Sequence, residues 1–197
     1  MKTIDFAGNG YISEIAPIFN DTILSNATVT GFINGESHIL KNFVVSGTEN
    51  NVGLFAVANQ VNFTQVLIED ITVAGNDCKN VGALVGSMLG GSIENCGVYL
   101  STSMENDGTI TYYSQKPDAT GKYKNEMEYR YNTKKITGME NVGGLIGVCN
   151  GTTIENCFAA IQVEAASRVA GGFVGEIASG SIKNTYASGN VTATSAA

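Results

Sequence analysis

Apolar residues occupy alternate positions in several short stretches of the chain. They do so in residues 96–100 and 157–163, and more loosely from Thr185 to Val191. A period of two is typical of a β-strand with one buried face. The pattern therefore predicts short strands separated by turns.

These stretches belong to an internal repeat. Segments beginning NVGALVG at Asn80, NVGGLIG at Asn141 and VAGGFVG at Val169 align, and a shorter copy begins at Asn51. An isoleucine follows the first position by 13 residues in three copies, at Ile93, Ile154 and Ile182. A constant offset of this kind indicates one structural unit used repeatedly.

The spacing of the copies predicts the architecture. Asn51 and Asn80 are 29 residues apart, Asn141 and Val169 are 28 apart, and Asn80 and Asn141 are 61 apart. Such a unit is shorter than the ~40 to 45 residues of a propeller blade and lacks the helical half of an ankyrin or tetratricopeptide repeat. We predict one all-β domain, residues 1–197, that forms a β-solenoid of about six coils. Residues 1–30 are expected to form a degenerate first coil or a cap.

An amide recurs after an apolar residue and one spacer in these units. Stacked amides donate and accept hydrogen bonds along a solenoid axis, as in the Asn ladders of cross-β assemblies. We therefore predict a structural ladder formed by Asn26, Asn42, Gln65, Asn95, Asn156 and Asn184.

Composition and charge narrow the function. Charged residues make up 15% of the chain and the net charge is −7, which disfavours a nucleic-acid partner because polyanions would be repelled. The longest apolar run is shorter than the roughly 18 to 20 residues of a transmembrane helix, so no membrane insertion is expected.

The blocks NVGGLIG…GTTIENC and AGGFVGEIASGSIKNTYASGNV resemble GLUG-motif repeats of bacterial cell-surface, adhesin-like proteins. They are also similar to N-terminal repeat regions of IgA-specific metallopeptidases. The resemblance covers residues 80–100, 141–163 and 169–191. It implies a right-handed parallel β-helix on a cell surface and no defined ligand. The zinc-peptidase motif HExxH is absent from the sequence, so the resemblance carries over no peptidase site.

Catalytic chemistry has little support in the residues. His38 is the single histidine, and a surface role fits it better than a triad or a metal site. Glu94 and Glu155 occupy the same repeat position, and stacked coils would bring them to a spacing close to the ~5 to 5.5 Å of a retaining glycosidase. We interpret them as a solvated charge ladder and predict no catalytic residues, cofactor or metal.

The four cysteines fit a core role. Cys96 and Cys157 share a repeat position, and Cys149 aligns with apolar residues. No C-x-x-C spacing exists, and cysteine in exchange with Met and Ile is typical of core packing. We predict four free thiols, with Cys96 and Cys157 as the one aligned pair that an oxidant would join.

The long gap between two repeats contains a repeat-breaking insertion, residues 102–137. It carries five of the eight tyrosines and six of the eleven basic residues. Repeat-breaking insertions often form the binding face, and Tyr and Arg are frequent in binding hot spots. A degenerate coil, or a hairpin that merely covers the solenoid, also explains the segment and is the simpler interpretation. The candidate partner-binding residues are Tyr112, Tyr113, Tyr123, Tyr129, Arg130 and Tyr131.

These observations predict a non-catalytic structural and adhesive module of a bacterial cell-surface protein. Its expected partners are an extracellular protein or glycan and the rest of a larger surface protein. The alternatives are a carbohydrate-active β-helix enzyme, either a lyase or a glycosidase, and an accessory domain that positions the substrate of a surface peptidase. The expected location is extracellular, with signal and anchor outside these residues.

Overall fold

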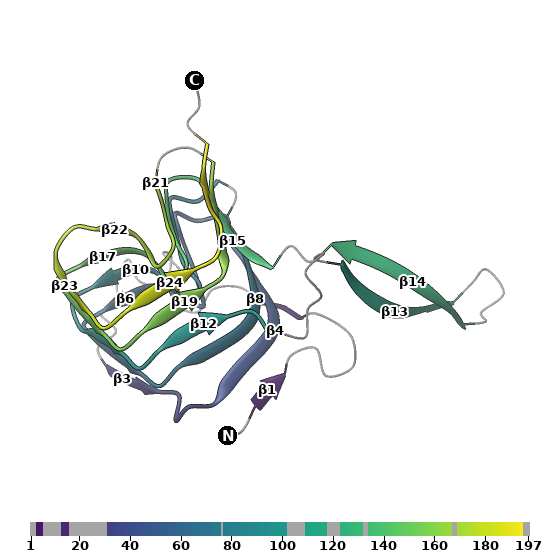
Figure 1. Cartoon of the computed structure of the whole chain (residues 1–197), viewed down its shortest axis with the longest axis horizontal. Coiled ribbons are helices and arrows are strands. Elements are labelled where there is room, and N and C mark those ends of the chain that lie inside the picture. The colour runs from purple at the N-terminus through teal and green to yellow at the C-terminus, as the bar shows by residue number, and fades with distance from the viewer. Residues whose placement is uncertain are drawn as a thin grey trace.

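The computed structural model is an all-β solenoid built from stacked parallel strands (Figure 1). It describes residues 3–5, 13–15, 31–75, 77–101, 109–117, 123–131, 134–166 and 169–194. Four complete turns begin at Asn51, Asn80, Asn141 and Val169, and a partial coil precedes them. The fold class predicted from the repeat spacing is confirmed.

Four stacks of strands form the walls. One four-stranded sheet contains β5 (Asn51–Val52), β9 (Asn80–Val81), β16 (Asn141–Gly143) and β21 (Val169–Gly171). The second contains β6 (Phe55–Asn59), β10 (Val85–Leu89), β17 (Ile146–Asn150) and β22 (Val174–Ile177). The five-stranded sheet contains β3 (Gly31–Asn34), β7 (Val61–Thr64), β11 (Ser92–Glu94), β18 (Thr152–Glu155) and β23 (Gly180–Lys183).

The ten-stranded sheet is bent along its length. Two strands span the bend, namely β4 (Ile39–Ser46) and β8 (Leu67–Gly75). Other coils use one strand on each side of the bend: β12 (Gly97–Tyr99), β19 (Phe158–Ala160) and β24 (Tyr186–Ser188) before it, and β15 (Lys135–Gly138), β20 (Gln162–Ala165) and β25 (Val191–Ala193) after it. Strands β1 (Thr3–Asp5) and β2 (Ser13–Ile15) pair with the two halves of β4 and extend the sheet.

The core is a set of columns of equivalent residues. Phe63, Ile93, Ile154 and Ile182 stack in register, and the first three are completely buried. The paired glycines allow close packing of neighbouring coils, because a Cβ at Gly143 would collide with the Ile146 carbonyl oxygen and the Gly175 nitrogen. Burial of these apolar columns supplies the main driving force for folding.

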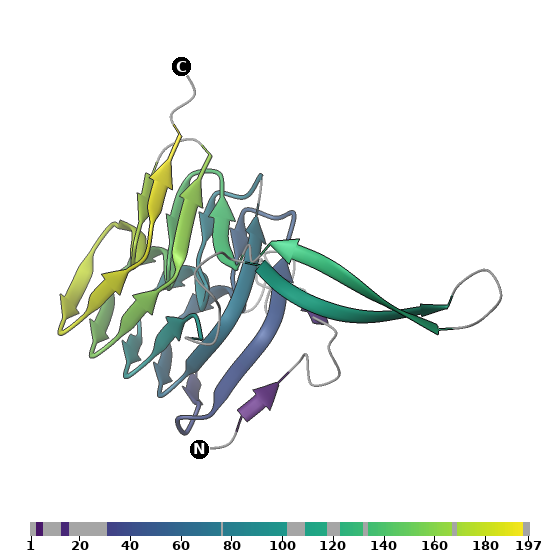
Figure 2. The same cartoon turned by 45° about the vertical axis from the view of Figure 1, so that its right-hand side comes forward.

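The predicted number of about six coils is too high. Asn42 lies at a different corner from Gln65, because β4 pairs with β8 so that Asn42 falls opposite Asp70. The expected rung at Asn26 lies outside the described residues. The extra length between Asn80 and Asn141 leaves the coil as a hairpin, β13 (Thr109–Pro117) and β14 (Tyr123–Tyr131), and adds no coil (Figure 2).

The amide positions serve the backbone more than a side-chain ladder. Gln65, Asn95, Asn156 and Asn184 stack, and all have φ between 52° and 56°, the left-handed region that Asn tolerates better than most residues. Asn184 Nδ2 donates to Asn156 Oδ1 at 3.2 Å, but Asn95 donates to its neighbour Glu94. The prediction of a continuous amide ladder at this corner is therefore wrong.

A three-rung amide ladder exists elsewhere. Asn80 Nδ2 donates to Asn51 Oδ1 at 2.7 Å, and Asn141 Nδ2 donates to Asn80 Oδ1 at 3.0 Å. These residues are the first positions of the repeat. Amides therefore do form hydrogen bonds along the solenoid axis, but in a different column from the predicted one.

Substitution of Asn156 by glycine and by alanine should separate the role of its backbone conformation from the role of its amide side chain. We expect Asn156→Ala to lower the free energy of unfolding by about 1–2 kcal/mol, because alanine is strained in the left-handed backbone conformation. Asn156→Gly should change it by less, since glycine adopts positive φ freely. Urea unfolding measures both. Equal losses for the two variants would mean that the amide side chain matters more than the backbone.

Candidate binding site at the hairpin root

The hairpin leaves the solenoid at the bend of the ten-stranded sheet. In the register, Tyr99 lies opposite Glu69, and Ile136 lies opposite Val73. The three residues between Glu69 and Val73 in one coil are thus replaced by residues 100–135 in the next, of which Lys135 already belongs to β15. Strand β15 pairs with β8 and β20, and Ile136 is completely buried, so the excursion ends before β15 and not at residue 137 as predicted.

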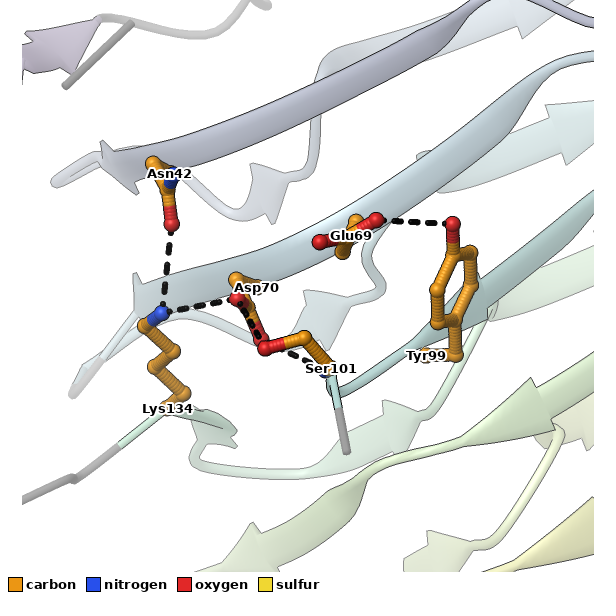
Figure 3. A network of polar contacts seen from close by, with 6 residues as sticks. All are labelled: Asn42, Glu69, Asp70, Tyr99, Ser101 and Lys134. Atoms are coloured by element: carbon orange, nitrogen blue, oxygen red, sulfur yellow. Dashed lines mark hydrogen bonds and ion pairs between the residues drawn. The ribbon is translucent and has the colours of Figure 1, made fainter. Parts of the chain in front are cut away.

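Asp70 ties down both ends of this excursion (Figure 3). Its φ of 55° turns the chain at the bend, and the residue is buried. Oδ1 accepts a hydrogen bond from the Ser101 backbone N–H at 2.9 Å, and Oδ2 accepts one from the Ser101 hydroxyl at 2.8 Å. On the other side, Lys134 Nζ lies 3.2 Å from Oδ2. The two ends of the hairpin therefore meet at one carboxylate.

Lys134 brings a positive charge next to the Asp70 carboxylate. The Lys134 and Asp70 side chains are only 8% and 7% exposed. Nζ also donates to Asn42 Oδ1 at 3.3 Å, so three successive coils contribute to one cluster, which we call the root cluster: Asn42, Asp70, Ser101 and Lys134. A buried charge without such partners would be strongly unfavourable.

A second polar contact lies beside the root cluster. Tyr99 Oη donates to Glu69 Oε2 at 2.8 Å, and burial together with this carboxylate raises the pKa of Tyr99 to about 12. The phenol therefore stays protonated and continues to donate at physiological pH. This contact holds the last strand before the excursion, β12, against β8.

The hairpin is an antiparallel ribbon that stands clear of the coils in both views (Figures 1 and 2). Its register pairs Thr109 with Tyr131 and Pro117 with Tyr123 without interruption. Directly paired residues share a face, and the face alternates along each strand. The register thus gives an uncharged face: Thr109, Thr111, Tyr113, Gln115, Pro117, Tyr123, Asn125, Met127, Tyr129 and Tyr131.

The opposite face holds every charged residue of the two strands. It consists of Ile110, Tyr112, Ser114, Lys116, Lys124, Glu126, Glu128 and Arg130. The six candidate binding residues are therefore divided. Tyr113, Tyr123, Tyr129 and Tyr131 share the uncharged face, whereas Tyr112 and Arg130 lie on the charged face. The segment forms a hairpin and not a degenerate coil, and its role in binding stays a prediction.

A shallow cavity of about 610 Å³ lies on the outer surface beyond the bend. Its walls come from β8, β15, β20 and β25 and carry threonine hydroxyls, including those of Thr72, Thr137 and Thr192. Lys135 and Glu164 form an ion pair of 2.7 Å in its wall. No pattern in the sequence identified this surface, because only the register places its threonines and alanines side by side.

Glu94 and Glu155 are neighbours in the register, as their shared repeat position predicted. Lys183 pairs with Glu155 at 3.0 Å on the exposed surface, and Glu94 accepts from Asn95 Nδ2. His38 donates through Nδ1 to the Gly35 carbonyl oxygen at 3.0 Å within its own turn. Among the described residues, no group of three or more His, Cys, Asp or Glu is arranged to hold a metal ion.

The four cysteines are buried and unbonded. Cys96 Sγ accepts the Val66 backbone N–H at 3.5 Å, and Cys157 Sγ accepts the Cys96 backbone N–H at 3.4 Å. Each sulfur thus satisfies an inward N–H of the preceding coil. The hydrogen bond with Cys157 and burial raise the pKa of the Cys96 thiol, and burial raises that of Cys149.

We expect a thiol reagent to find four thiols in denaturant without reductant. Reaction in the native state at neutral pH should be slow, because all four cysteines are buried and raised pKa values keep the Cys96 and Cys149 thiols protonated, whereas the thiolate is the nucleophile. Absorbance of the released aromatic thiolate measures both. A count of two would contradict this and show one disulfide.

Comparison with known families gives one match within the chain. Residues 166–192 match the GLUG motif. The recognition of GLUG repeats from the sequence is confirmed. The matching GLUG segment covers β21 to β24 and the start of β25, the last coil described.

One solved structure, described as "a putative immunoglobulin A1 protease from Bacteroides ovatus", is similar to the chain at a TM-score of 0.48 and 17% identity. The alignment covers 98% of this chain and 59% of that chain, so the chain spans about three-fifths of that structure. No curated protein matches. In the part of the chain that the structure describes, no helix has the length and apolar character needed to cross a membrane.

The GLUG coil has its core positions open to solvent on one side. Ile182 is 38% exposed, although it stacks on the fully buried Ile154. Tyr186 is 60% exposed and stacks on Phe158, with ring centroids 5.5 Å apart. In contrast, Ile93 and Ile154, which lie in the same column as Ile182, are completely buried.

Proposed function

We propose that this protein is a non-catalytic recognition module of a bacterial cell-surface protein. The solenoid is the scaffold, and the β13–β14 hairpin is the element that contacts an extracellular protein or glycan. The GLUG motif supports the surface assignment, because the sequence resembles repeats of such proteins.

One observation carries the proposal, namely the division of the hairpin into two chemically different faces. Four tyrosines and Met127 share a face without charge, while Arg130, the lysines and the glutamates share the other. Tyrosine provides a large, rigid contact area with a polar end, and it is frequent in hot spots of binding surfaces. A hairpin that only covered the solenoid would lie against the coils, whereas this one projects from them.

The root cluster supports the same interpretation. A recognition element binds more tightly when its conformation is fixed before binding. Ser101 and Lys134 fix both ends of the excursion to Asp70, which belongs to the preceding coil. The hairpin is thereby attached to a scaffold whose backbone is paired from coil to coil.

The surface carboxylates support a non-catalytic function. Glu155 is charge-balanced by Lys183, and Glu94 accepts a hydrogen bond from Asn95. Exposed pairs of this kind are common and contribute little energy. A carboxylate acting as acid or nucleophile would need a partner group positioned across a substrate-binding cleft.

The test is a binding array of mammalian and bacterial glycans, serum proteins and extracellular-matrix proteins. The whole chain should bind at least one component. A variant in which Gly-Ser-Gly replaces residues 103–132 keeps Ser101, Lys134 and β15, so it should fold and lose that binding. Circular dichroism confirms the fold. Equal binding by both proteins, absence of any binding, or cleavage of a polysaccharide on the array would contradict the proposal.

A further inference from the structure

The root cluster brings together three groups that can react with one another. Lys134 Nζ lies 3.3 Å from the carboxamide oxygen of Asn42 and 3.2 Å from Oδ2 of Asp70. Asn42 comes from β4, Asp70 from β8, and Lys134 from the segment that enters β15. An amine, an amide and a carboxylate thus meet at a site where Lys134 and Asp70 are more than nine-tenths buried.

We propose that Lys134 and Asn42 become joined by an intramolecular amide (isopeptide) bond. Lys134 Nζ attacks Cγ of Asn42, the new Nζ–Cγ bond forms, and the Cγ–Nδ2 bond breaks. Nδ2 leaves as ammonia. The reaction needs no oxidant, reductant or further reactant, because one amide replaces another.

Asp70 carries the proton in this reaction. The Lys134 ammonium passes one proton to the Asp70 carboxylate, whose Oδ2 lies 3.2 Å from Nζ. The amine that remains is the nucleophile. Asp70 then delivers this proton to Nδ2, which leaves as ammonia, and Asp70 takes up the second Nζ proton as the new amide forms. The Ser101 N–H and hydroxyl hold the carboxylate in place throughout.

The geometry favours attack on Asn42 by Lys134 over attack by water. Reacting atoms held about 3–3.5 Å apart react far faster than free groups. Nζ lies 3.3 Å from the Asn42 amide oxygen, and attack requires Nζ to move from that oxygen to the adjacent carbon, Cγ. Asn42 is fixed by its turn, with φ of 59°. Burial of the amine and the carboxylate excludes water from their side of the amide.

The bond would fasten the hairpin permanently. It would connect β4 to the start of β15 across β8 and close a loop from residue 42 to residue 134. The link would resist both reductant and pulling on the hairpin. This inference does not depend on the ligand of the hairpin, so its failure would leave the proposed function standing.

Electrospray mass spectrometry of the purified, unfolded chain tests the proposal. The expected mass is about 17 Da below that of the sequence, the loss of one ammonia. After trypsin, residues 131–135 should appear joined to residues 42–79, with fragment ions that place the link on Asn42. The variants Lys134→Arg, which keeps the charge, and Asp70→Asn, which keeps the shape, should both have the unmodified mass and a native circular dichroism spectrum.

Three results would overturn the proposal. An unmodified wild-type mass would show that no bond forms. A loss of about 18 Da would indicate release of water and a Lys134–Asp70 bond instead. A loss of about 17 Da that persists in Lys134→Arg would come from a cyclic imide at an Asn-Gly sequence such as Asn34-Gly35.

Discussion

Replacing Asp70 with alanine is expected to give a free energy of unfolding about 3–5 kcal/mol below that of Lys134→Arg, which keeps the buried ion pair but cannot form the Lys134–Asn42 bond; this is the usual cost of leaving one member of a buried ion pair alone. The Lys134 ammonium would remain buried without its carboxylate, and the Ser101 N–H and hydroxyl would lose their acceptor. Urea unfolding followed by circular dichroism measures the change.

The matched control is the double variant Asp70→Ala/Lys134→Met. It removes the unpaired charge and keeps an apolar side chain of similar length, so it should regain much of the lost stability. Neither variant can form the Lys134–Asn42 bond by way of Asp70, so their difference reports the buried charge alone. A double variant as unstable as Asp70→Ala would contradict this account of the root cluster.

Substitution of two tyrosines on the uncharged face should have the largest effect on binding. A single hot-spot side chain contributes about 2 kcal/mol or more, which corresponds to about 30-fold in affinity, so Tyr113→Ala combined with Tyr129→Ala should weaken binding by well over 30-fold. The register places both residues on one face, near the centre of the ribbon. Surface plasmon resonance against the array component bound by the whole chain measures the loss.

The charged face provides the comparison. Lys116 and Lys124 lie directly opposite each other, and like charges at such positions repel. Lys116→Ala with Lys124→Ala should therefore leave the hairpin intact and change affinity less than the tyrosine pair does. A larger loss for the lysine pair would show that the charged face makes the contact.

The coils were predictable because stacking imposes a constant offset. Ile93, Ile154 and Ile182 each follow their repeat start by the same distance, and in the structure they form one column. Alternation along residues 157–163 likewise reports the buried face of β19 and β20. The constant offset and the alternation both arise because each coil pairs with its neighbour in a fixed register, which places equivalent residues in one column.

The hairpin and its root were only partly predictable. Tyrosine content and the broken repeat identified the segment, but the face of each residue depends on the pairing of Thr109 with Tyr131. Asp70 gave no sequence signal, because its partners Ser101 and Lys134 are distant in the chain and meet only when coils stack. The predicted end of the insertion, residue 137, lies too far along the chain. Lys135 is basic like the residues before it, although it begins β15.

Hydrogen exchange tests the central claim most directly, because it locates the contact on the protein itself. Amide exchange would be measured by mass spectrometry with and without a saturating amount of the component bound on the array. Recognition by the hairpin predicts slowed exchange in peptides covering residues 109–131 and unchanged exchange in residues 92–94 and 152–155. Protection of those coil residues, around Glu94 and Glu155, with an unprotected hairpin would contradict it.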